Sequence, residues 1–435
     1  MLTHDDNELL CRVGPGTPMG TLMRRYWIPA GLGAELPEPD GAPLRVKLLG
    51  EELIAFRTTS GGVGLLQSAC PHRGASMFFG RNEEDGLRCV YHGWKFDTSG
   101  ACVDMPNEPA ESNFKHKIKA TAYPCVERGG LIWAYMGPDM PPPPLPDLEA
   151  NMLPDGEWSL NVFTRDCNYM QALEGDIDTS HVGFLHSGYV DTSKVPPHTF
   201  AAYSLGEKAL RYEVTDTDAG VMYGAFRPAE EDSWYWRVAQ FLFPFYTMTP
   251  TGVLGMEVRA RAWVPMDDSH TLAIGMTRRV ANRQSLTGEA SIQLDMHPNT
   301  TDWHGRFRYV AGRSNDYQID RERQRTVSYT GIRGITMQDQ AVTESMGHIY
   351  QRTNERLGTS DLMIIRTRRR MIEAAKALRD SGAPPPTADT PGAYATRPGG
   401  VVLPRTANWI EATEHLRRGF VEHPELSRSI LGGAA

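Results

Sequence analysis

The sequence predicts an α+β protein, in which an all-β domain is followed by a larger α+β domain with an antiparallel sheet surrounded by helices. Three observations lead to this prediction. Short β-type runs separated by turn residues fill residues 43–139. A proline-rich stretch follows at 140–146, and strand and helix patterns share residues 147–435. With 435 residues the chain is also long for one domain, so two domains are the natural expectation.

Residues 1–42 are expected to form a helical lead before the first domain. Helical patterns occupy residues 5–13 and 19–26, and glycines and prolines at 14–18 break the chain between them. Residues 27–30 are expected to pack this lead against the domain. The strands expected in the domain itself lie at 44–49, 52–57, 64–67, 87–91 and 131–136.

The stretch 140–146 is expected to be an extended linker, because four consecutive prolines at 141–144 exclude a helix. A strand-like run at 158–166 then leads into a helical pattern at 168–174. The remaining expected elements are strands at 212–214, 235–243, 256–264 and 271–276 and helices at 361–380 and 408–421. The strands are expected to form one antiparallel sheet in the second domain.

Two short segments in the all-β region each contain one cysteine and one histidine. Cys70 and His72 lie in the first segment, and Cys89 and His92 lie in the second, sixteen residues further on. This spacing matches the two-loop ligand set of a Rieske 2Fe-2S centre, in which two cysteines hold one iron and two histidines hold the other. Neutral imidazoles raise the reduction potential, so such a centre accepts single electrons from a flavin or ferredoxin partner.

A structural zinc site is the alternative for the same four residues, since two cysteines and two histidines also satisfy tetrahedral zinc. Zinc sites of that class usually pair cysteine with cysteine and histidine with histidine, whereas here each loop supplies one of each. The pattern therefore favours the iron-sulfur cluster. Glycines at 74 and 93 favour tight turns around it.

A second metal site is indicated by His181 and His186, five residues apart, with Asp178 just before them. Two histidines and one carboxylate form the facial triad of non-haem Fe(II) enzymes. Five residues turn a helix by about 140°, so we expect the helix to end or distort between the histidines, at Gly183. Two hydrogen-bonded core histidines are the alternative interpretation. The occurrence of this pair together with the cluster motif favours an iron site.

The carboxylate of this triad must come from another part of the chain. Asp339 is the candidate, because it lies near the start of a helical pattern where it can point inward. Glu344 is the second candidate. An acid at either position is also compatible with an ordinary charge on a helix surface.

Together these motifs resemble the oxygenase component of a Rieske non-haem iron oxygenase, the ring-hydroxylating oxygenase alpha subunit, of the phthalate dioxygenase type with a single kind of subunit. The resemblance covers nearly the full chain. It implies one Rieske 2Fe-2S cluster and one mononuclear Fe(II) per subunit. The implied ligands are Cys70, His72, Cys89 and His92 for the cluster and His181, His186 and Asp339 for the iron.

The resemblance also implies a head-to-tail homotrimer, or two stacked trimers, with each cluster beside the iron of the neighbouring subunit. Asp178 matches the acid that bridges the two centres in the family, accepting hydrogen bonds from His92 of one subunit and His181 of the next. A helix-start acid favoured by the helix dipole is the other interpretation of Asp178, and both roles are compatible.

For function, the leading hypothesis is an oxygenase that uses O2 to oxidise an aromatic carboxylate by phthalate-like dihydroxylation. A monooxygenase that O-demethylates a methoxylated or aryl-ether aromatic acid is the alternative. A Rieske electron carrier and a zinc-stabilised binding protein are the non-enzymatic alternatives. An anionic substrate favours an arginine in the pocket, but no single residue is assigned among Arg227, Arg237, Arg259 and Arg261.

Composition restricts the partners and the compartment. A net charge of -8 gives no indication of a nucleic-acid partner, and no apolar run approaches the roughly 20 residues of a membrane-spanning helix. The N-terminus lacks a signal-peptide pattern, and six cysteines without tight pairing suit a reducing cytoplasm. No dinucleotide fingerprint is present, so we expect NADH to act through a separate reductase, which the resemblance implies carries flavin and a 2Fe-2S cluster.

Overall fold

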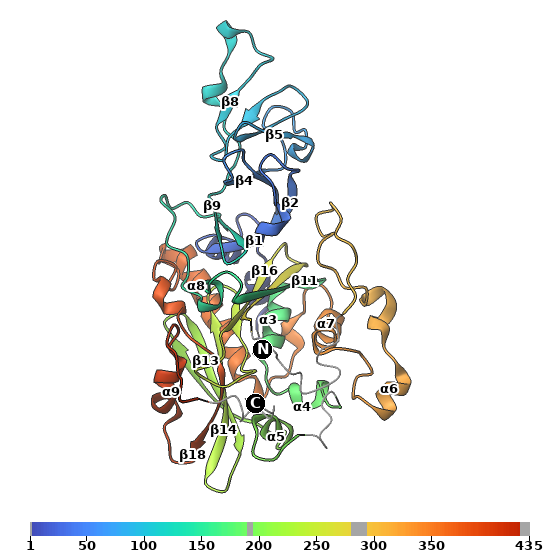
Figure 1. Ribbon diagram of the computed structural model, residues 1–435, viewed down its shortest axis with the longest axis vertical. Coiled ribbons are helices and arrows are strands. Elements are labelled where there is room, and N and C mark those ends of the chain that lie inside the picture. The colour runs from blue at the N-terminus through green and yellow to red at the C-terminus, as the bar shows by residue number, and fades with distance from the viewer. Residues whose placement is uncertain (1, 189–194, 280–293, 427–435) are drawn as a thin grey trace.

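The computed structural model describes residues 2–188, 195–279 and 294–426. The molecule is elongated, with a domain of small sheets at one end and a larger domain at the other (Figure 1). Small sheets followed by one large antiparallel sheet with helices confirm the predicted α+β class. No helix in the three described ranges is long and apolar enough to cross a membrane.

Three small antiparallel sheets make up the first domain. The first contains β1 (Trp27–Leu32), β10 (Leu131–Tyr135) and β9 (Cys125–Arg128). The second contains β2 (Leu44–Leu48), β3 (Glu51–Arg57) and β4 (Val63–Gln67). The third contains β5 (Arg81–Glu83), β6 (Gly86–Arg88), β7 (Lys95–Phe96) and β8 (Cys102–Asp104). Buried side chains such as Phe56, Leu87 and Phe96 form a core here that is separate from the main one.

The N-terminal stretch is helical only at its start. Helices α1 (His4–Cys11) and α2 (Pro18–Met23) lie where the sequence predicted helices, and Thr3 and Thr17 cap them. Residues 27–32, which the sequence placed in the helical lead, instead form β1 and pair with β10. Nearly all of β1 is buried. A strand buried on both faces does not alternate between polar and apolar residues, and that is why its pattern was missed.

The second domain is built on an eight-stranded antiparallel sheet among the described residues. Its strands, in spatial order, are β11 (Trp158–Arg165), β17 (Thr271–Arg278), β16 (Arg259–Pro265), β15 (Tyr246–Met248), β14 (Ser233–Leu242), β13 (Gly220–Pro228) and β12 (Arg211–Thr217), with β18 (Gly399–Pro404) paired to β14. Every strand predicted for this domain is present. The sequence did not predict β13, whose nearly continuous burial hides any alternation, nor the short strand β15 or the glycine-led strand β18.

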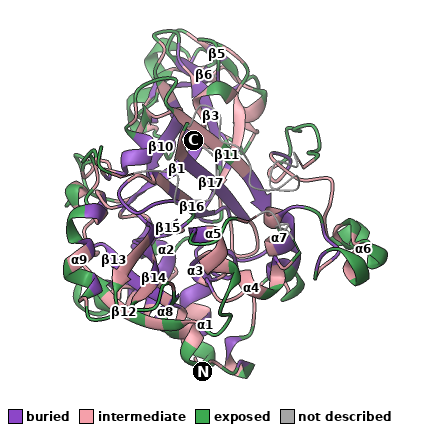
Figure 2. Cartoon of the chain, turned by 60° about the horizontal axis from the view of Figure 1, so that its bottom comes forward, coloured by how far each residue is buried: buried purple, intermediate pink, exposed green. Residues whose placement is uncertain are grey.

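Helices surround this sheet. They are α3 (Tyr169–Ile177), α4 (Val182–Leu185), α5 (Phe200–Leu205), α6 (Arg321–Thr326), α7 (Ile335–Ser345), α8 (Leu362–Ser381) and α9 (Trp409–Arg417). Figure 2 shows buried residues along the strands of the sheet and an exposed α6 at the periphery. The helices predicted at 168–174, 361–380 and 408–421 correspond to α3, α8 and α9.

Two of these helices, α3 and α7, are fixed to each other by buried polar contacts. The side-chain amide of Gln171 on α3 donates to the carbonyl oxygens of Thr343 (3.0 Å) and Gly347 (2.9 Å) at the end of α7. Glu174 on α3 accepts hydrogen bonds from Arg352 and Arg368 in a buried ion cluster. Since buried charges are tolerated only when paired, this cluster holds α3 in one position.

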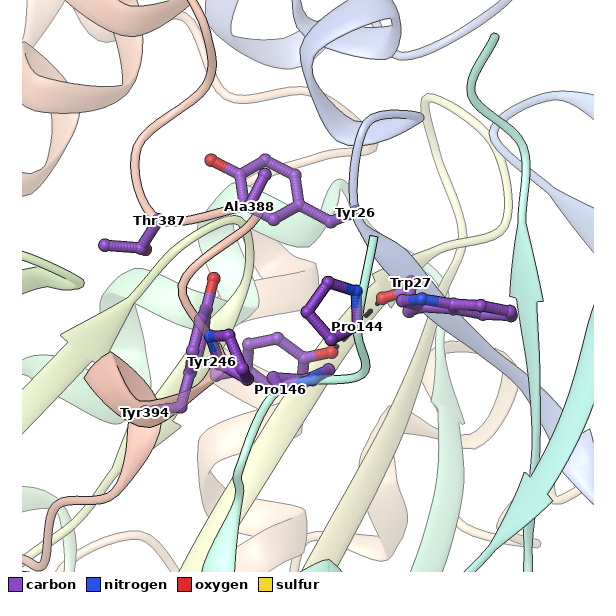
Figure 3. Close-up of a pocket in the computed structure, with 9 residues that line it drawn as sticks. Tyr26, Trp27, Pro144, Pro146, Tyr246, Thr387, Ala388 and Tyr394 are labelled. Carbon is purple, nitrogen blue, oxygen red and sulfur yellow. Dashed lines mark hydrogen bonds between the residues drawn. The ribbon is translucent and has the colours of Figure 1, made fainter. Parts of the chain in front are cut away.

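The linker 140–146 packs against the junction of the two domains. The indole nitrogen of Trp27 donates to the carbonyl oxygen of Pro143 (2.6 Å), and the hydroxyl of Tyr246 donates to the carbonyl oxygen of Trp27 (3.4 Å). A small pocket lies at this junction, and Figure 3 shows Pro144, Pro146 and Tyr246 among the residues that line it. The second half of the linker is therefore anchored at the junction.

A second contact between the domains centres on Asp267, just after β16. Its carboxylate accepts hydrogen bonds from the ring nitrogens of His270 (2.9 Å) and His304 (2.9 Å), and the ammonium of Lys47 on β2 lies 3.4 Å away. The two imidazole rings stack with centroids 3.8 Å apart. Burial would raise the pKa of Asp267, but these histidines hold it well below its usual range. The hydrogen bond to Asp267 raises the pKa of His270.

Replacing Asp267 with asparagine is expected to lower the free energy of unfolding by about 1–3 kcal/mol. The carboxylate stabilises the fold above its unfolded pKa of about 4, whereas the raised pKa of His270 adds stability below about pH 6.5 that is lost as the pH rises. Denaturation at pH 5.5 and 8.5 should therefore show the larger loss at pH 5.5. Asp268→Asn is the control, because Asp268 bonds to Arg12 and not to an imidazole. Equal losses of unfolding free energy in Asp267→Asn at both pH values would contradict the prediction.

Candidate metal centres

The two cysteine-histidine segments each form a turn, and the two turns are of the same kind. In the first, the amide of Gly74 donates to the carbonyl oxygen of Cys70 at 2.9 Å, and in the second Gly93 donates to Cys89 at the same distance. Both glycines have positive φ angles, of +76° and +81°. Glycine adopts that conformation without strain, so the sequence builds two matching loops that each present one thiol and one imidazole.

The side chains of these loops converge. The rings of His72 and His92 lie edge to face with centroids 4.4 Å apart, and His72 stacks on Trp94 at 4.3 Å. Both thiols are buried, and burial raises the pKa of Cys70 to about 11, reinforced by the nearby Cys89. The Nδ1 atom of His72 is buried without a hydrogen-bond partner. A buried polar atom left unpaired is costly, so these residues fit a metal cluster that binds them.

The residues of the second predicted centre also lie close together. His181 and His186 flank α4, and Asp339 lies in α7. The carboxylate of Asp339 is 3.5 Å from Nε2 of His181 and 3.2 Å from Nε2 of His186. The imidazole rings are nearly perpendicular, at 80°, with centroids 5.1 Å apart. All three ligand atoms lie within 4.8 Å of one another, as a facial triad requires.

The backbone reaches this arrangement differently from what the sequence predicted. Gly183 was expected to interrupt a helix between the histidines, but it lies inside the one-turn helix α4. The helix does end between the two histidines, as expected, but at Leu185. Because α4 ends at Leu185, the chain places both imidazoles on the side facing α7.

The triad has the electrostatics of a cation site. Burial would lower the pKa of His181, but Asp178 and Asp339 outweigh burial and raise the pKa to about 10. Burial would likewise raise the pKa of Asp339, yet the two histidines hold it well below its usual range. An ionised carboxylate beside two imidazoles in a mostly enclosed place favours a bound metal ion.

The second candidate for the carboxylate, Glu344, points elsewhere. Its oxygens accept hydrogen bonds from the amide of Asp166 (2.9 Å), the hydroxyl of Tyr317 (2.7 Å) and the side chain of Gln340 (2.7 Å). Burial raises the pKa of Glu344. Of the two acids that the sequence offered, the structure brings Asp339 to the histidines.

Asp178 lies beside the triad. One carboxylate oxygen accepts hydrogen bonds from the amide (2.7 Å) and hydroxyl (2.6 Å) of Ser180. The other oxygen is 3.4 Å from Nδ1 of His181, the ring nitrogen on the far side from Asp339. Among the described residues, no hydrogen bond joins Asp178 to His92. Figure 1 places β5, next to the cluster loops, and α4, next to the triad, far apart along the molecule.

The four arginines considered for substrate binding all have partners within the protein. These partners are Ser204 for Arg227, Thr179 for Arg237, Glu257 for Arg259 and Asp176 for Arg261. The contact between Arg261 and Asp176, at 2.6 Å, is shorter than the contact between Arg259 and Glu257, at 3.7 Å. Sequence reasoning missed Gln338, whose side chain contacts His186; its only signal was its position next to Asp339.

The cluster of Asp267, His270 and His304 also has the composition of a metal site. Its two rings are nearly parallel, at 20°. An imidazole nitrogen binds a metal in the plane of its ring, and two stacked rings cannot direct both lone pairs at one ion. The perpendicular rings of His181 and His186 do not have this restriction.

A small-sheet domain with two Cys-His loops, followed by an antiparallel sheet with a His/Asp triad, defines a Rieske non-haem iron oxygenase. Residues 26–124 match the family described as Rieske [2Fe-2S] domain, and residues 134–421 match the family described as LigXa C-terminal domain like. The chain belongs to the Rieske non-haem iron oxygenases. It is the oxygenase component of a multicomponent system with electron-transfer partners, and its triad fits a mononuclear iron site.

Relatives of known function cover the chain almost completely. The chain is 45% identical over 433 residues to the 3-chlorobenzoate-3,4-dioxygenase oxygenase subunit of Comamonas testosteroni, covering 97% of this chain and 100% of the relative. It is 38% identical over 409 residues to the phthalate 4,5-dioxygenase oxygenase subunit of Pseudomonas putida, covering 87% of each. The 5,5'-dehydrodivanillate O-demethylase oxygenase subunit of Sphingobium sp. is 34% identical, over 86% of this chain and 80% of the relative.

Solved structures share the fold. Dicamba monooxygenase bound to dicamba aligns with a TM-score of 0.55 at 19% identity, over 82% of this chain and 99% of that one. NdmA from Pseudomonas putida CBB5 aligns with a TM-score of 0.51 at 19% identity, over 90% and 99%. At these identities the comparison shows the fold alone.

Proposed function

We propose that this chain is the oxygenase subunit of a dioxygenase that adds both atoms of O2 to the ring of an aromatic carboxylate. The observation that carries the proposal is the meeting of His181, His186 and Asp339, from α4 and α7, in one facial set. The 3-chlorobenzoate and phthalate dioxygenase relatives support the substrate class.

Each metal-binding residue then has a role. Cys70 and Cys89 hold one iron of the cluster and His72 and His92 hold the other, while His181, His186 and Asp339 hold Fe(II). When bound, the two centres supply single electrons and the activation of dioxygen. The polypeptide fixes the ligands: Gly74 and Gly93 shape the cluster loops, and α7 carries Asp339 to the histidines.

The subunits are proposed to act as a head-to-tail homotrimer, or as two stacked trimers. Within one chain the two centres are far apart, so electrons must pass from the cluster of one subunit to the iron of the next. Phe79, Val90 and Tyr91 beside the cluster loops are 65%, 57% and 54% exposed, which supports a protein partner at that face. Asp178 is proposed to accept a hydrogen bond from His92 of the neighbouring subunit and to bridge the centres.

The remaining assignments follow from this role. A separate reductase, with flavin and a 2Fe-2S cluster, is proposed to deliver electrons from NADH, and the system is proposed to work in the cytoplasm. The proposed domain limits are 1–42 for the lead, 43–139 for the Rieske domain, 140–146 for the linker and 147–435 for the catalytic domain, with β1 of the lead paired into a sheet of the Rieske domain.

O-demethylation is the second candidate, because the 5,5'-dehydrodivanillate O-demethylase relative is 34% identical to this chain. Both reactions use the same metal centres and differ in which carbon of the substrate faces the iron. Aromatic acids with and without methoxy groups should therefore be incubated with the oxygenase, a reductase, NADH and labelled O2. Two labelled oxygens on the ring are expected. One labelled oxygen with release of formaldehyde would replace dihydroxylation with demethylation.

A further inference from the structure

We propose that Gln338 is a positioning residue for the mononuclear iron. Its side chain holds His186 in the tautomer and orientation that present Nε2 to the metal. This inference rests on the proposed function, because it takes His186 as an iron ligand. It concerns a neutral residue next to Asp339 that has no place among the metal ligands themselves.

Gln338 is buried, with 1% of its surface exposed, and lies in α7 one residue before Asp339. Its side-chain oxygen is 2.7 Å from Nδ1 of His186. Its side-chain nitrogen donates a hydrogen bond to the carbonyl oxygen of Ile332 at 2.8 Å. Both ends of the amide are therefore engaged.

These two contacts fix the direction of the amide. The carbonyl oxygen of Ile332 only accepts hydrogen bonds, so the NH2 group of Gln338 must face it. The oxygen of the amide is then left for His186, and an oxygen can only accept. The proton of a neutral His186 must therefore sit on Nδ1.

A proton on Nδ1 leaves the lone pair of the ring on Nε2. That nitrogen is the one 3.2 Å from the carboxylate of Asp339. A histidine that binds a metal through one nitrogen usually donates the other N–H to a fixed acceptor, which sets the tautomer and the direction of the ring. Gln338 supplies this acceptor from inside the same helix that carries the carboxylate ligand.

The two histidines of the triad thus have partners of different charge. Nδ1 of His181 faces the carboxylate of Asp178, whereas Nδ1 of His186 faces a neutral amide. Two carboxylates, Asp178 and Asp339, then match the double positive charge of a ferrous ion. A neutral acceptor orients His186 without adding a third negative charge to the enclosed site.

The chain provides a matched control in Gln340. It has the same side chain, lies on the same helix and is also buried, with 6% exposed. Its amide donates to Glu344 at 2.7 Å and contacts neither histidine. A variant at this position tests what loss of a buried amide in α7 does to the fold alone.

Gln338→Met and Gln340→Met should be compared with the wild type by anaerobic titration with Fe(II) and by thermal unfolding. Methionine keeps the volume and the helix but removes the acceptor. Gln338→Met is expected to lower the affinity for Fe(II) about 10- to 100-fold, with an unchanged visible spectrum of the cluster. Gln340→Met is expected to leave the affinity for Fe(II) unchanged, whatever its melting temperature.

A wild-type affinity for Fe(II) in Gln338→Met, or an equal loss in both variants, would overturn the inference. His186→Ala separates this outcome from a failure of the proposed function. If the wild type bound no Fe(II), or if His186→Ala bound it as well as the wild type, the metal site itself would be wrong. If His186→Ala lost the iron and Gln338→Met kept it, only the role of Gln338 would be rejected.

Discussion

Replacing Asp339 with alanine is expected to remove the mononuclear iron and abolish turnover while the Rieske cluster stays in place. Asp339 is the carboxylate that contacts both His181 and His186, at 3.5 and 3.2 Å. Two imidazoles without an anion hold Fe(II) poorly, so the loss of affinity should exceed the roughly 100-fold typical of residues behind a ligand. Iron analysis after anaerobic reconstitution, together with the visible spectrum, measures both centres in one sample.

Glu344→Gln is the control for this experiment. Glu344 is another buried acid of α7, but it accepts hydrogen bonds from Asp166 and Tyr317 on the far side from the histidines. Its variant is expected to retain the mononuclear iron. Full retention of that iron in Asp339→Ala would remove Asp339 from the triad.

The cluster loops were predictable because their information is local. Each loop places its cysteine and histidine within four residues, and glycine at 74 or 93 supplies the positive φ angle that closes the turn. The structure adds the contacts that sequence spacing does not contain, such as the stacking of His72 on Trp94.

The triad was predictable only in part, because its carboxylate comes from a distant helix. The sequence offered Asp339 and Glu344 on the same helical pattern. Five residues separate them, which corresponds to about 140° around the helix axis, so only one of them can face the histidines. Which one does depends on how α7 packs against α3, and that packing is set by Gln171 and its long-range contacts.

The sequence could not predict strands that lack alternation or functional residues that carry no charge. β1 and β13 are buried on both faces, so a period of two has nothing to mark it. Gln338 is a neutral residue whose partner, His186, lies 152 positions away in the chain. Such residues become visible only when the hydrogen bonds of the buried amides are followed to both ends.

Replacing Asp178 with asparagine is expected to slow turnover by about 100-fold or more while both metal centres remain bound. Asparagine keeps an oxygen that can accept from Nδ1 of His181, so both centres should stay bound when Fe(II) is supplied in excess. Its carboxylate is held by Ser180 on one side and lies 3.4 Å from Nδ1 of His181 on the other. Burial would raise the pKa of Asp178, but His181 and Ser180 lower it, so the group is ionised at neutral pH.

An asparagine at this position removes the negative charge, and its amide must turn its oxygen toward His181 to keep that hydrogen bond. It then presents NH2 where His92 of a neighbouring subunit is proposed to donate. The measurement is the rate at which the pre-reduced cluster is reoxidised in a single turnover with substrate and O2. Asp176→Asn is the matched control two residues away, because Asp176 bonds to Arg261 and Trp263 and not to His181.

If Asp178 serves only to start or orient the short helix α4, both variants should reoxidise the cluster at the wild-type rate and differ only in stability. A slow rate confined to Asp178→Asn places the acid on the electron route. Because the two centres of one chain lie far apart (Figure 1), that result also requires a second subunit at the triad. The same variant therefore tests the proposed trimer. An Asp178→Asn protein that is monomeric and reoxidises its cluster at the wild-type rate would contradict both the bridge and the assembly.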